Sequence, residues 1–449
     1  MWRPQGGPFV GDGGDRIPTQ LIDLRTPVDR AVLVGAPSRS EARDVADEHL
    51  HELARLTDTA GGEVVGSLVQ RLNAPHPRYY LGEGKARSLG ELVQEREANL
   101  VIFDEELSPA QGKNLEELLK VRVMDRSELI LDIFATRARS REARMQVELA
   151  QLEYLLPRLR RMWSHLSRIR GGIGLRGPGE TQLETDRRLI GTRIGDLKRK
   201  LREVAKARAV QRKSREGLFR VALVGYTNAG KSSLLRALSG ADLFVEDRLF
   251  ATLDSATRNV DLGGGYEALV TDTVGFIRKL PHHLVASFRS TLEEAGEADV
   301  LLHVIDASHP DWEEQREVVL EVLGDLALDG REKILVFNKT DRIDEVERES
   351  LERRIRALEP TPAVFVSAHR EESLEALRET LQARIRNRLS QVIVRIPFAD
   401  GEAIAAVYRE GEVTERVDEA MDVRLTARLP HGVLGRLTAR GGIEIEEVA

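Results

Sequence analysis

The segment GYTNAGKS at 225–232 has the residue types and spacing of a phosphate-binding loop. An apolar run typical of a buried strand, Leu218–Val224, precedes it, and a helical pattern, Ser233–Ser239, follows it. In this context backbone N–H groups can surround a β-phosphate, Lys231 can reach the β- and γ-phosphate oxygens, and the hydroxyl of Ser232 can bind Mg²⁺. The segment therefore predicts a nucleoside phosphate site with Mg²⁺ as cofactor.

Two later segments, DTVG and NKTD, fit the same site in chain order. In DTVG, Asp272 would contact Mg²⁺ through water, and the N–H of Gly275 would donate to a γ-phosphate. In NKTD, the carboxylate of Asp341 can accept both the N1 and N2 protons of guanine, a pair that adenine lacks. Such pairing can discriminate between ligands by about 10⁴–10⁵. The two segments predict GTP and GDP as ligands.

Further residues are expected around the guanine base. Asn338 would hold the base loop against the phosphate loop, and Lys339 would lie along the base. The segment SAH at 367–369 follows a short predicted strand and would donate N–H groups to the guanine carbonyl.

The segment FATLD at 250–254 is expected to be the first switch. There Thr252 would bind Mg²⁺ and the γ-phosphate, with Ser255 and Thr257 as nearby alternatives. The predicted catalytic residues are Lys231 and Gly275, and the predicted Mg²⁺ ligands are Ser232, Thr252 and, through water, Asp272. The predicted GTP-binding residues are Gly225, Tyr226, Thr227, Asn228, Ala229, Gly230, Lys231, Ser232, Phe250, Ala251, Thr252, Leu253, Asp254, Asp272, Thr273, Val274, Gly275, Asn338, Lys339, Thr340, Asp341, Ser367, Ala368 and His369.

Phe276 follows DTVG at a position where a glutamine can orient the attacking water. A phenyl ring cannot do so, and its ordinary role would be packing. We therefore expect slow unaided hydrolysis. A partner that orders the switches would remedy this, because such stabilisation is worth about 10³–10⁵ in rate.

The elements around these motifs alternate between strand and helix patterns, which predicts an α/β fold with a mostly parallel, doubly wound sheet. We assign residues 217–390 to this GTPase domain. A disordered tail is expected over residues 1–20 and a small α/β subdomain over 21–136. Residues 391–449 show strand, helix, two strands, helix and strand patterns, which predict a small α+β domain.

A helical hairpin is expected over residues 137–216. Apolar residues recur in heptad steps from Met145 to Leu166 and again from Ile190 to Val204, with a Gly-rich stretch between the two runs. Two such helices joined by a loop should pack antiparallel.

Positive charge is concentrated in the same part of the chain. The net charge is −7, yet residues 137–220 contain 23 Lys/Arg against 9 Asp/Glu. This asymmetry predicts a polyanion-binding element, with a solvated helical face as the alternative. The candidate phosphate contacts at the Gly-rich tip are Arg168, Arg170, Arg176, Arg187 and Arg188; the alternative for the tip itself is a flexible connector.

Composition excludes several classes of protein. The chain has no cysteine, so disulfides and thiolate metal sites are excluded. No apolar run approaches the roughly 18 residues of a membrane span, and the first twenty residues lack the apolar core of a signal peptide. We expect a cytoplasmic monomer that does not bind membranes.

The motifs LGEGK, FDEELSP, GGIGLRGPGETQLETDRR, GYTNAGKSSL, FATLD and DTVGFI together resemble the HflX family of bacterial GTPases over residues 21–385. The resemblance implies a Ras-like GTPase domain behind an α/β subdomain with a helical hairpin. It also implies binding to the large (50S) ribosomal subunit and its 23S rRNA, with a role in splitting or rescuing stalled ribosomes under stress. The sequence departs from the family pattern at Ser255-Ala256, where Pro-Thr is usual.

Two points stay open at this stage. In some similar GTPases an asparagine at the position of Asn228 helps to hold K⁺ against the phosphates; the alternative is a turn-forming residue. The alternative function is a GTP-gated assembly or anti-association factor with little ribosome-stimulated turnover. An ATP-driven N-terminal domain is a weaker alternative, because no second phosphate loop is present in the sequence.

Overall fold

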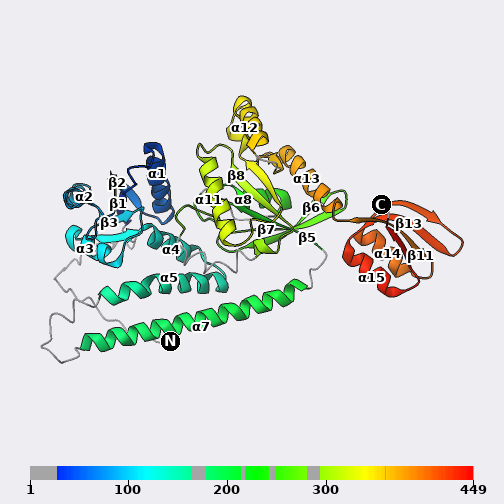
Figure 1. The fold of residues 1–449 in the computed structure, drawn as a ribbon, viewed down its shortest axis with the longest axis horizontal. Helices are drawn as coiled ribbons and strands as arrows, with labels where there is room; N and C mark the ends of the chain where they lie inside the picture. The colour runs from blue at the N-terminus through cyan, green and yellow to red at the C-terminus, as the bar shows by residue number, and fades with distance from the viewer. Residues whose placement is uncertain are drawn as a thin grey trace, which may run out of the picture.

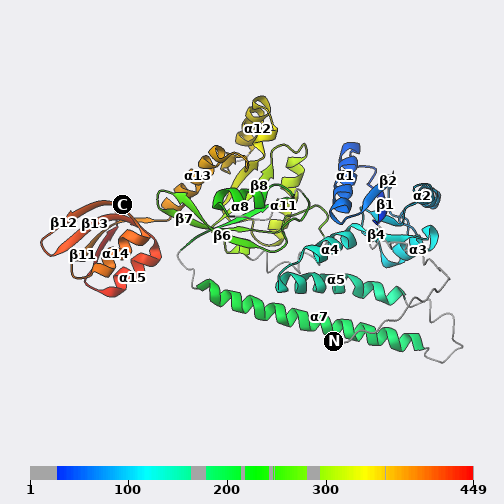
Figure 2. The same ribbon diagram turned by 180° about the vertical axis from the view of Figure 1, so that it is seen from behind.

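The computed structural model contains three β-sheets in a row, with the long helix α7 (Pro178–Lys213) running beside the first two (Figures 1 and 2). It describes residues 28–162, 178–213, 218–241, 246, 248–280, 294–358 and 361–447. The tail expected over residues 1–20 lies outside this part of the chain.

The N-terminal domain is a parallel sheet in the strand order β2-β1-β3-β4. One face packs on α1 and α4, and the other face packs on α2 and α3, so the central strands β1 and β3 are almost wholly buried. The elements of this domain are β1 (Arg30–Gly35), α1 (Arg43–Thr59), β2 (Glu63–Val69), α2 (Glu83–Glu95), β3 (Leu100–Phe103), α3 (Pro109–Leu119), β4 (Arg122–Asp125) and α4 (Arg126–Arg137).

The expected antiparallel hairpin is formed by α5 (Arg141–Met162) and α7. Met145 and Leu149 of α5 are buried against Leu197 of α7, with further heptad residues of both helices around them. At 1.5 Å per residue, the 36 residues of α7 span about 54 Å. This helix begins at Pro178, before the heptad run, where a proline at the first helical position costs no hydrogen bond.

The central sheet has the order β10-β9-β8-β5-β7-β6; β6 is antiparallel to β7, and the other neighbours are parallel. The doubly wound α/β arrangement predicted from the sequence is confirmed, although the β6–β7 hairpin was not predicted. The elements are β5 (Phe219–Gly225), α8 (Lys231–Ser239), β6 (Ala256–Gly263), β7 (Tyr266–Asp272), β8 (Val300–Asp306), α11 (Trp312–Asp325), β9 (Lys333–Asn338), η1 (Thr340–Arg342), α12 (Glu345–Leu358), β10 (Ala363–Phe365), η2 (Glu371–Leu374) and α13 (Glu375–Arg386).

The C-terminal domain is an antiparallel sheet in the order β12-β13-β11-β14, with two helices on one face. Its element order agrees with the sequence prediction: β11 (Ser390–Pro397), α14 (Gly401–Glu410), β12 (Glu412–Asp418), β13 (Asp422–Leu429), α15 (His431–Arg440) and β14 (Glu444–Glu447). The hydroxyl of Tyr266, in the central sheet, donates a 2.6 Å hydrogen bond to Glu412, which connects this domain to its neighbour.

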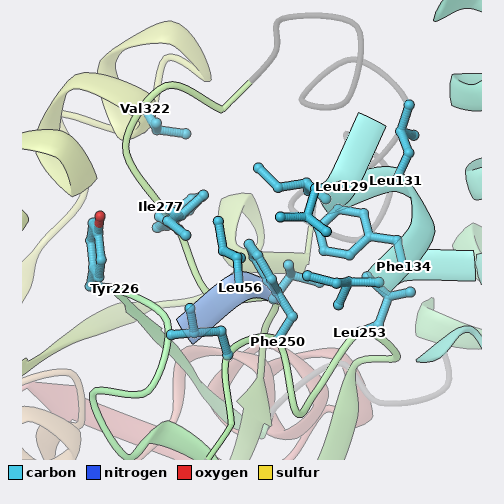
Figure 3. Packing of buried hydrophobic residues seen from close by; sticks show 14 of the residues in the cluster. Leu56, Leu129, Leu131, Phe134, Tyr226, Phe250, Leu253, Ile277 and Val322 are labelled. Carbon is cyan, nitrogen blue, oxygen red and sulfur yellow. The ribbon is translucent and has the colours of Figure 1, made fainter. Parts of the chain in front are cut away.

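One apolar core joins the N-terminal domain to the GTPase domain. Figure 3 shows Leu129 and Phe134 of α4 in the same cluster as Phe250, Leu253 and Ile277 from the GTPase domain. The rings of Phe134 and Phe250 meet edge to face, with centroids 4.7 Å apart. Because this core contains residues of both switch segments, the N-terminal domain is packed directly against the switches.

The two substitutions Gly411→Ala and Gly435→Ala should have opposite effects on the C-terminal domain. A Cβ at Gly411 would lie 2.2 Å from Cδ2 of Leu429, so we expect a loss of about 1–3 kcal/mol in the free energy of unfolding. Gly435 is exposed within α15 with open space around it, so alanine should stabilise by about 0.5–1 kcal/mol. Calorimetric unfolding of both variants measures this, and a stable Gly411→Ala protein would contradict the packing described.

Candidate functional site

The phosphate loop connects β5 to α8, and at two of its positions there is no room for a side chain. A Cβ at Gly225 would lie 2.3 Å from the carbonyl oxygen of Val304, and one at Gly230 would lie 2.3 Å from Nδ2 of Asn338. Gly230 also has a φ of 92°, which favours glycine. The loop is therefore fixed at the N-terminus of α8, where backbone N–H groups favour an anion.

Lys231 is buried beneath this loop. Its Nζ donates to the carbonyl oxygens of Gly225 and Tyr226, at 3.2 and 2.9 Å. Burial lowers its pKa to about 8, although Asp272 acts in the opposite direction. The ammonium group lines an open cavity together with residues of the phosphate loop, which suits it to phosphate.

Three oxygen-bearing side chains from separate segments converge beside Lys231. Oγ of Ser232 lies 2.6 Å from Oγ1 of Thr252 and 2.6 Å from Oδ2 of Asp272. Oδ1 of Asp272 is buried and has no hydrogen-bond partner among the described residues. Burial raises the pKa of Asp272 against the effect of Lys231. Because a buried carboxylate oxygen needs a partner and Mg²⁺ prefers oxygen ligands, this donor set fits a magnesium ion.

The three hydroxyl residues considered for the first switch lie in different places. Thr252 is the one beside Ser232. Thr257 lies on β6, and its hydroxyl is 2.9 Å from that of Thr271 across the β6–β7 pair. Ser255 directly precedes this strand. Of the three, Thr252 is therefore the one whose hydroxyl could bind the same metal ion as Ser232.

Asn338, at the end of β9, connects the phosphate loop to the predicted base-binding segments. Its Nδ2 donates to the carbonyl oxygen of Ala229 at 3.0 Å, and its Oδ1 accepts the N–H of Ala368 at 3.1 Å. The neighbouring Lys339 pairs with Asp306 at 2.6 Å. The amide of Asn338 thus holds two loops in one place, as its predicted bracing role requires.

Asp341 lies at the open end of this arrangement and is partly exposed. Its Oδ1 accepts a 2.5 Å hydrogen bond from the hydroxyl of Ser367, which in turn accepts the N–H of His369 at 3.2 Å. Burial acts to raise the pKa of Asp341, but the hydrogen bond from Ser367 and one from its own backbone lower it overall. The carboxylate therefore favours its ionised form, which can accept two hydrogen bonds from a ligand.

The second switch, Asp272–Lys279, is joined to the phosphate loop by two backbone hydrogen bonds. The N–H of Thr227 donates to the carbonyl of Phe276 at 2.6 Å, and the N–H of Phe276 donates to the carbonyl of Gly225 at 3.1 Å. A Cβ at Gly275 would lie 2.7 Å from Cα of Thr227 and 2.9 Å from Nζ of Lys231. The ring of Phe276 is buried in the core shared with the N-terminal domain.

The first switch contacts both the phosphate loop and the helical hairpin. The N–H of Phe250 donates to Oγ1 of Thr227 at 2.9 Å. The carboxylate of Asp254 accepts the N–H groups of Arg139 and Ser140, at 3.0 and 3.1 Å, and also the Ser140 hydroxyl. Asp254, which the sequence placed among the GTP-binding residues, thus binds the backbone just before α5.

A group of buried polar residues near the site was not predicted from the sequence. It comprises Glu52 of α1, Asp104 after β3, Arg126 of α4, Tyr226 of the phosphate loop and Arg278 of the second switch, and we call it the interdomain polar cluster. All five residues are less than a tenth exposed. No local pattern indicates them, because their partners are distant in sequence.

Two of the candidate polyanion contacts can be placed. Arg187 and Arg188 lie exposed on α7, near its N-terminal end. Arg168, Arg170 and Arg176 lie outside the described residues. Within the described chain, no helix is long and apolar enough to cross a membrane.

Comparisons with known proteins cover most of the chain. Three family models match: "GTP-binding GTPase N-terminal" over residues 47–135, "GTP-binding GTPase Middle Region" over 137–215 and "50S ribosome-binding GTPase" over 220–339. A GTPase HflX of Magnetococcus marinus is 44% identical over 433 residues, which cover 95% of this chain and 99% of the relative. The GTPase HflX of Escherichia coli (strain K12) is 44% identical over 387 residues, covering 85% and 90%.

Among solved structures, the chain is similar to a GTP-binding protein from the hyperthermophilic archaeon Sulfolobus solfataricus in complex with GDP. The TM-score is 0.43 and the identity 24%, covering 79% of this chain and 98% of that one.

Proposed function

The chain belongs to the HflX family of GTPases and is a GTP-hydrolysing enzyme; we propose that it acts on the large ribosomal subunit, which stimulates its hydrolysis. In this proposal, the work of the cycle is to split or rescue stalled ribosomes in the cytoplasm. The observation that supports the chemistry most is the convergence of Ser232, Thr252 and Asp272 beside the buried Lys231.

Guanine recognition is assigned to the end of β9 and the loop after β10. The carboxylate of Asp341 accepts the N1 and N2 protons of the base, while Ser367 keeps the carboxylate oriented. Asn338 holds the base loop against the phosphate loop, so contacts within the protein set the distance between the base site and the phosphate site.

Phosphate binding is assigned to the phosphate loop and the two switches. Backbone N–H groups at the start of α8 and the ammonium of Lys231 bind the β- and γ-phosphates, and the N–H of Gly275 donates to the γ-phosphate. Ser232 and Thr252 would hold Mg²⁺ directly and Asp272 through water. The ion would supply electrostatic stabilisation of the phosphate oxygens.

Hydrolysis needs another group to orient the attacking water, because the ring of Phe276 is buried in the apolar core. A buried phenyl group cannot orient water, so the attacking water has no hydrogen-bond partner from the side chain at this position. We assign that contribution to the ribosomal subunit, with K⁺ at Asn228 as a second contributor. Asn228 lines the phosphate cavity with a φ of 61°, so its backbone has the left-handed conformation of a tight turn.

The hairpin is the proposed rRNA-binding element. Arg187 and Arg188 are exposed on α7, and Asp254 ties the first switch to the start of the partner helix α5. Contact of the hairpin with RNA is therefore placed to influence the first switch.

Asp341→Asn should change the base preference. The amide can no longer accept both guanine protons, so affinity for GTP and GDP should fall at least about tenfold, and xanthine nucleotides should bind better. Competition against a fluorescent GDP measures this. Asp344→Asn, three residues further on and directed at the start of α12, should leave the preference unchanged. Unaltered GTP affinity in Asp341→Asn would remove the base assignment.

GTP turnover should depend on the subunit. Purified protein alone should turn over slowly, and large ribosomal subunits should raise the rate by about 10³-fold, the lower end of the range for an arginine finger supplied by a partner. Measuring turnover in potassium and again in sodium separates the part due to a monovalent cation. No rise in either salt would favour a GTP-gated assembly or anti-association factor.

The double charge reversal Arg187→Glu with Arg188→Glu should weaken subunit binding and leave GTP affinity unchanged. The log–log salt dependence of binding should become shallower by roughly one unit per lost phosphate contact. The matched control is Arg353→Glu with Arg356→Glu, both exposed on α12. Equal losses in the two double variants would argue against the hairpin as the RNA contact.

A further inference from the structure

Tyr226 of the phosphate loop does not line the phosphate cavity; its side chain enters the interdomain polar cluster. Its hydroxyl donates to Glu52 of the N-terminal domain and accepts the backbone N–H of Arg278 at 3.0 Å. Burial, and next Glu52, raise the pKa of Tyr226 well above its usual value, so the hydroxyl keeps its proton. One hydroxyl therefore joins three segments: α1, the phosphate loop and the second switch.

Glu52 is held by two guanidinium groups. Arg126 of α4 donates to it, and Nε of Arg278 lies 3.1 Å from its Oε1. The same Arg126 donates to the backbone carbonyl of Arg278 at 3.3 Å. The backbone of the second switch is thus bound at both its N–H and its C=O by groups that depend on Glu52.

Asp104 completes the cluster from the end of β3. It lies 2.9 Å from Arg126, 3.4 Å from Arg278 and 2.7 Å from Lys279. Burial alone would raise the pKa of Asp104, but Arg126, then Arg278 and Lys279, hold it well below its usual range. The carboxylate is therefore ionised and fixes the end of the second switch.

These contacts determine where Gly275 lies, because Arg278 is only three residues further along the chain. Gly275 packs against Cα of Thr227 and Nζ of Lys231, and Phe276 pairs with the phosphate loop. Contacts within the protein therefore suffice to hold the proposed γ-phosphate donor beside the phosphate cavity. A loop ordered by such contacts reduces the conformational entropy that binding costs.

We propose that Glu52 is a positioning residue of the GTPase site: through Tyr226 and Arg278 the N-terminal domain holds the second switch where Gly275 can bind a γ-phosphate. This inference rests on the proposed assignment of Gly275. GDP has no γ-phosphate, so the cluster contributes to the binding of GTP and contributes little to the binding of GDP.

The test compares a non-hydrolysable GTP analogue with GDP on the full-length protein with Mg²⁺. Glu52→Gln should weaken the analogue about tenfold, the effect of one buried hydrogen bond to a charged group, and change GDP affinity less than twofold. Glu48→Gln is the matched control: it lies on the same helix one turn away, and its carboxylate faces His309 instead of Tyr226. It should change neither affinity.

Tyr226→Phe provides a second variant that keeps the ring and introduces no charge change. It should show the same selective loss, and the double variant with Glu52→Gln should lose about tenfold in total rather than a hundredfold, because the two side chains act as one unit. Thermal unfolding of each variant verifies that the domains remain assembled.

The measurements distinguish failure of the positioning role from failure of the nucleotide site. Equal losses for GDP and the analogue, unchanged affinities, full additivity in the double variant, or the same selective loss in Glu48→Gln would each overturn the positioning role. Wild-type protein that binds neither guanine nucleotide would overturn the proposed nucleotide site, and this inference with it.

Discussion

The burial of Arg126 constrains how the N-terminal domain and the GTPase domain are placed. A buried guanidinium is tolerated only when it is paired, and its partners Glu52 and Asp104 come from other elements of the same domain. These two carboxylates leave one negative charge in excess, and Arg278 of the GTPase domain lies against both. Separating the domains would remove Arg278 from the excess negative charge, so the second switch has a defined position against the N-terminal sheet.

The apolar contacts also hold the two switches against the N-terminal domain. Phe250 of the first switch and Phe276 of the second are each about 2% exposed, and both belong to the core that includes Phe134 of α4. In doubly wound sheets, ligands usually bind at the carboxyl ends of the strands, where the strand order reverses. In the N-terminal sheet, Asp104 at this edge binds Arg278 and Lys279. The second switch therefore contacts the N-terminal sheet at the edge where doubly wound sheets usually bind ligands.

The sequence predicted those parts of the molecule that depend on the spacing of residues close together in the chain. The phosphate loop, the helix after it and the heptad hairpin follow from residue spacing alone, and the structure has each of them. The predicted fold class is likewise confirmed. Strand β6 was missed, because only Val260 and Leu262 of its eight residues are buried and its first half is mostly polar.

Contacts between distant segments could not be predicted in the same way. Glu52 and Arg278 are ordinary charged residues on a helix and a loop, and their pairing depends on how two domains dock. Asp254 was expected near the nucleotide because of its neighbours, yet its side chain binds the start of α5. The surrounding fold, and not the sequence motif, determines which groups such a side chain contacts.

The sequence separation within the polar cluster has a consequence for synthesis of the chain. Arg126 and Arg278 are 152 residues apart, so at about 5–20 residues per second the N-terminal domain exists for roughly 8–30 s before its partner emerges from the ribosome. During that interval, the apolar face around Phe134 and the excess carboxylate have nothing to cover them. During synthesis, the N-terminal domain therefore exposes apolar surface that is prone to non-native contacts until the second switch follows.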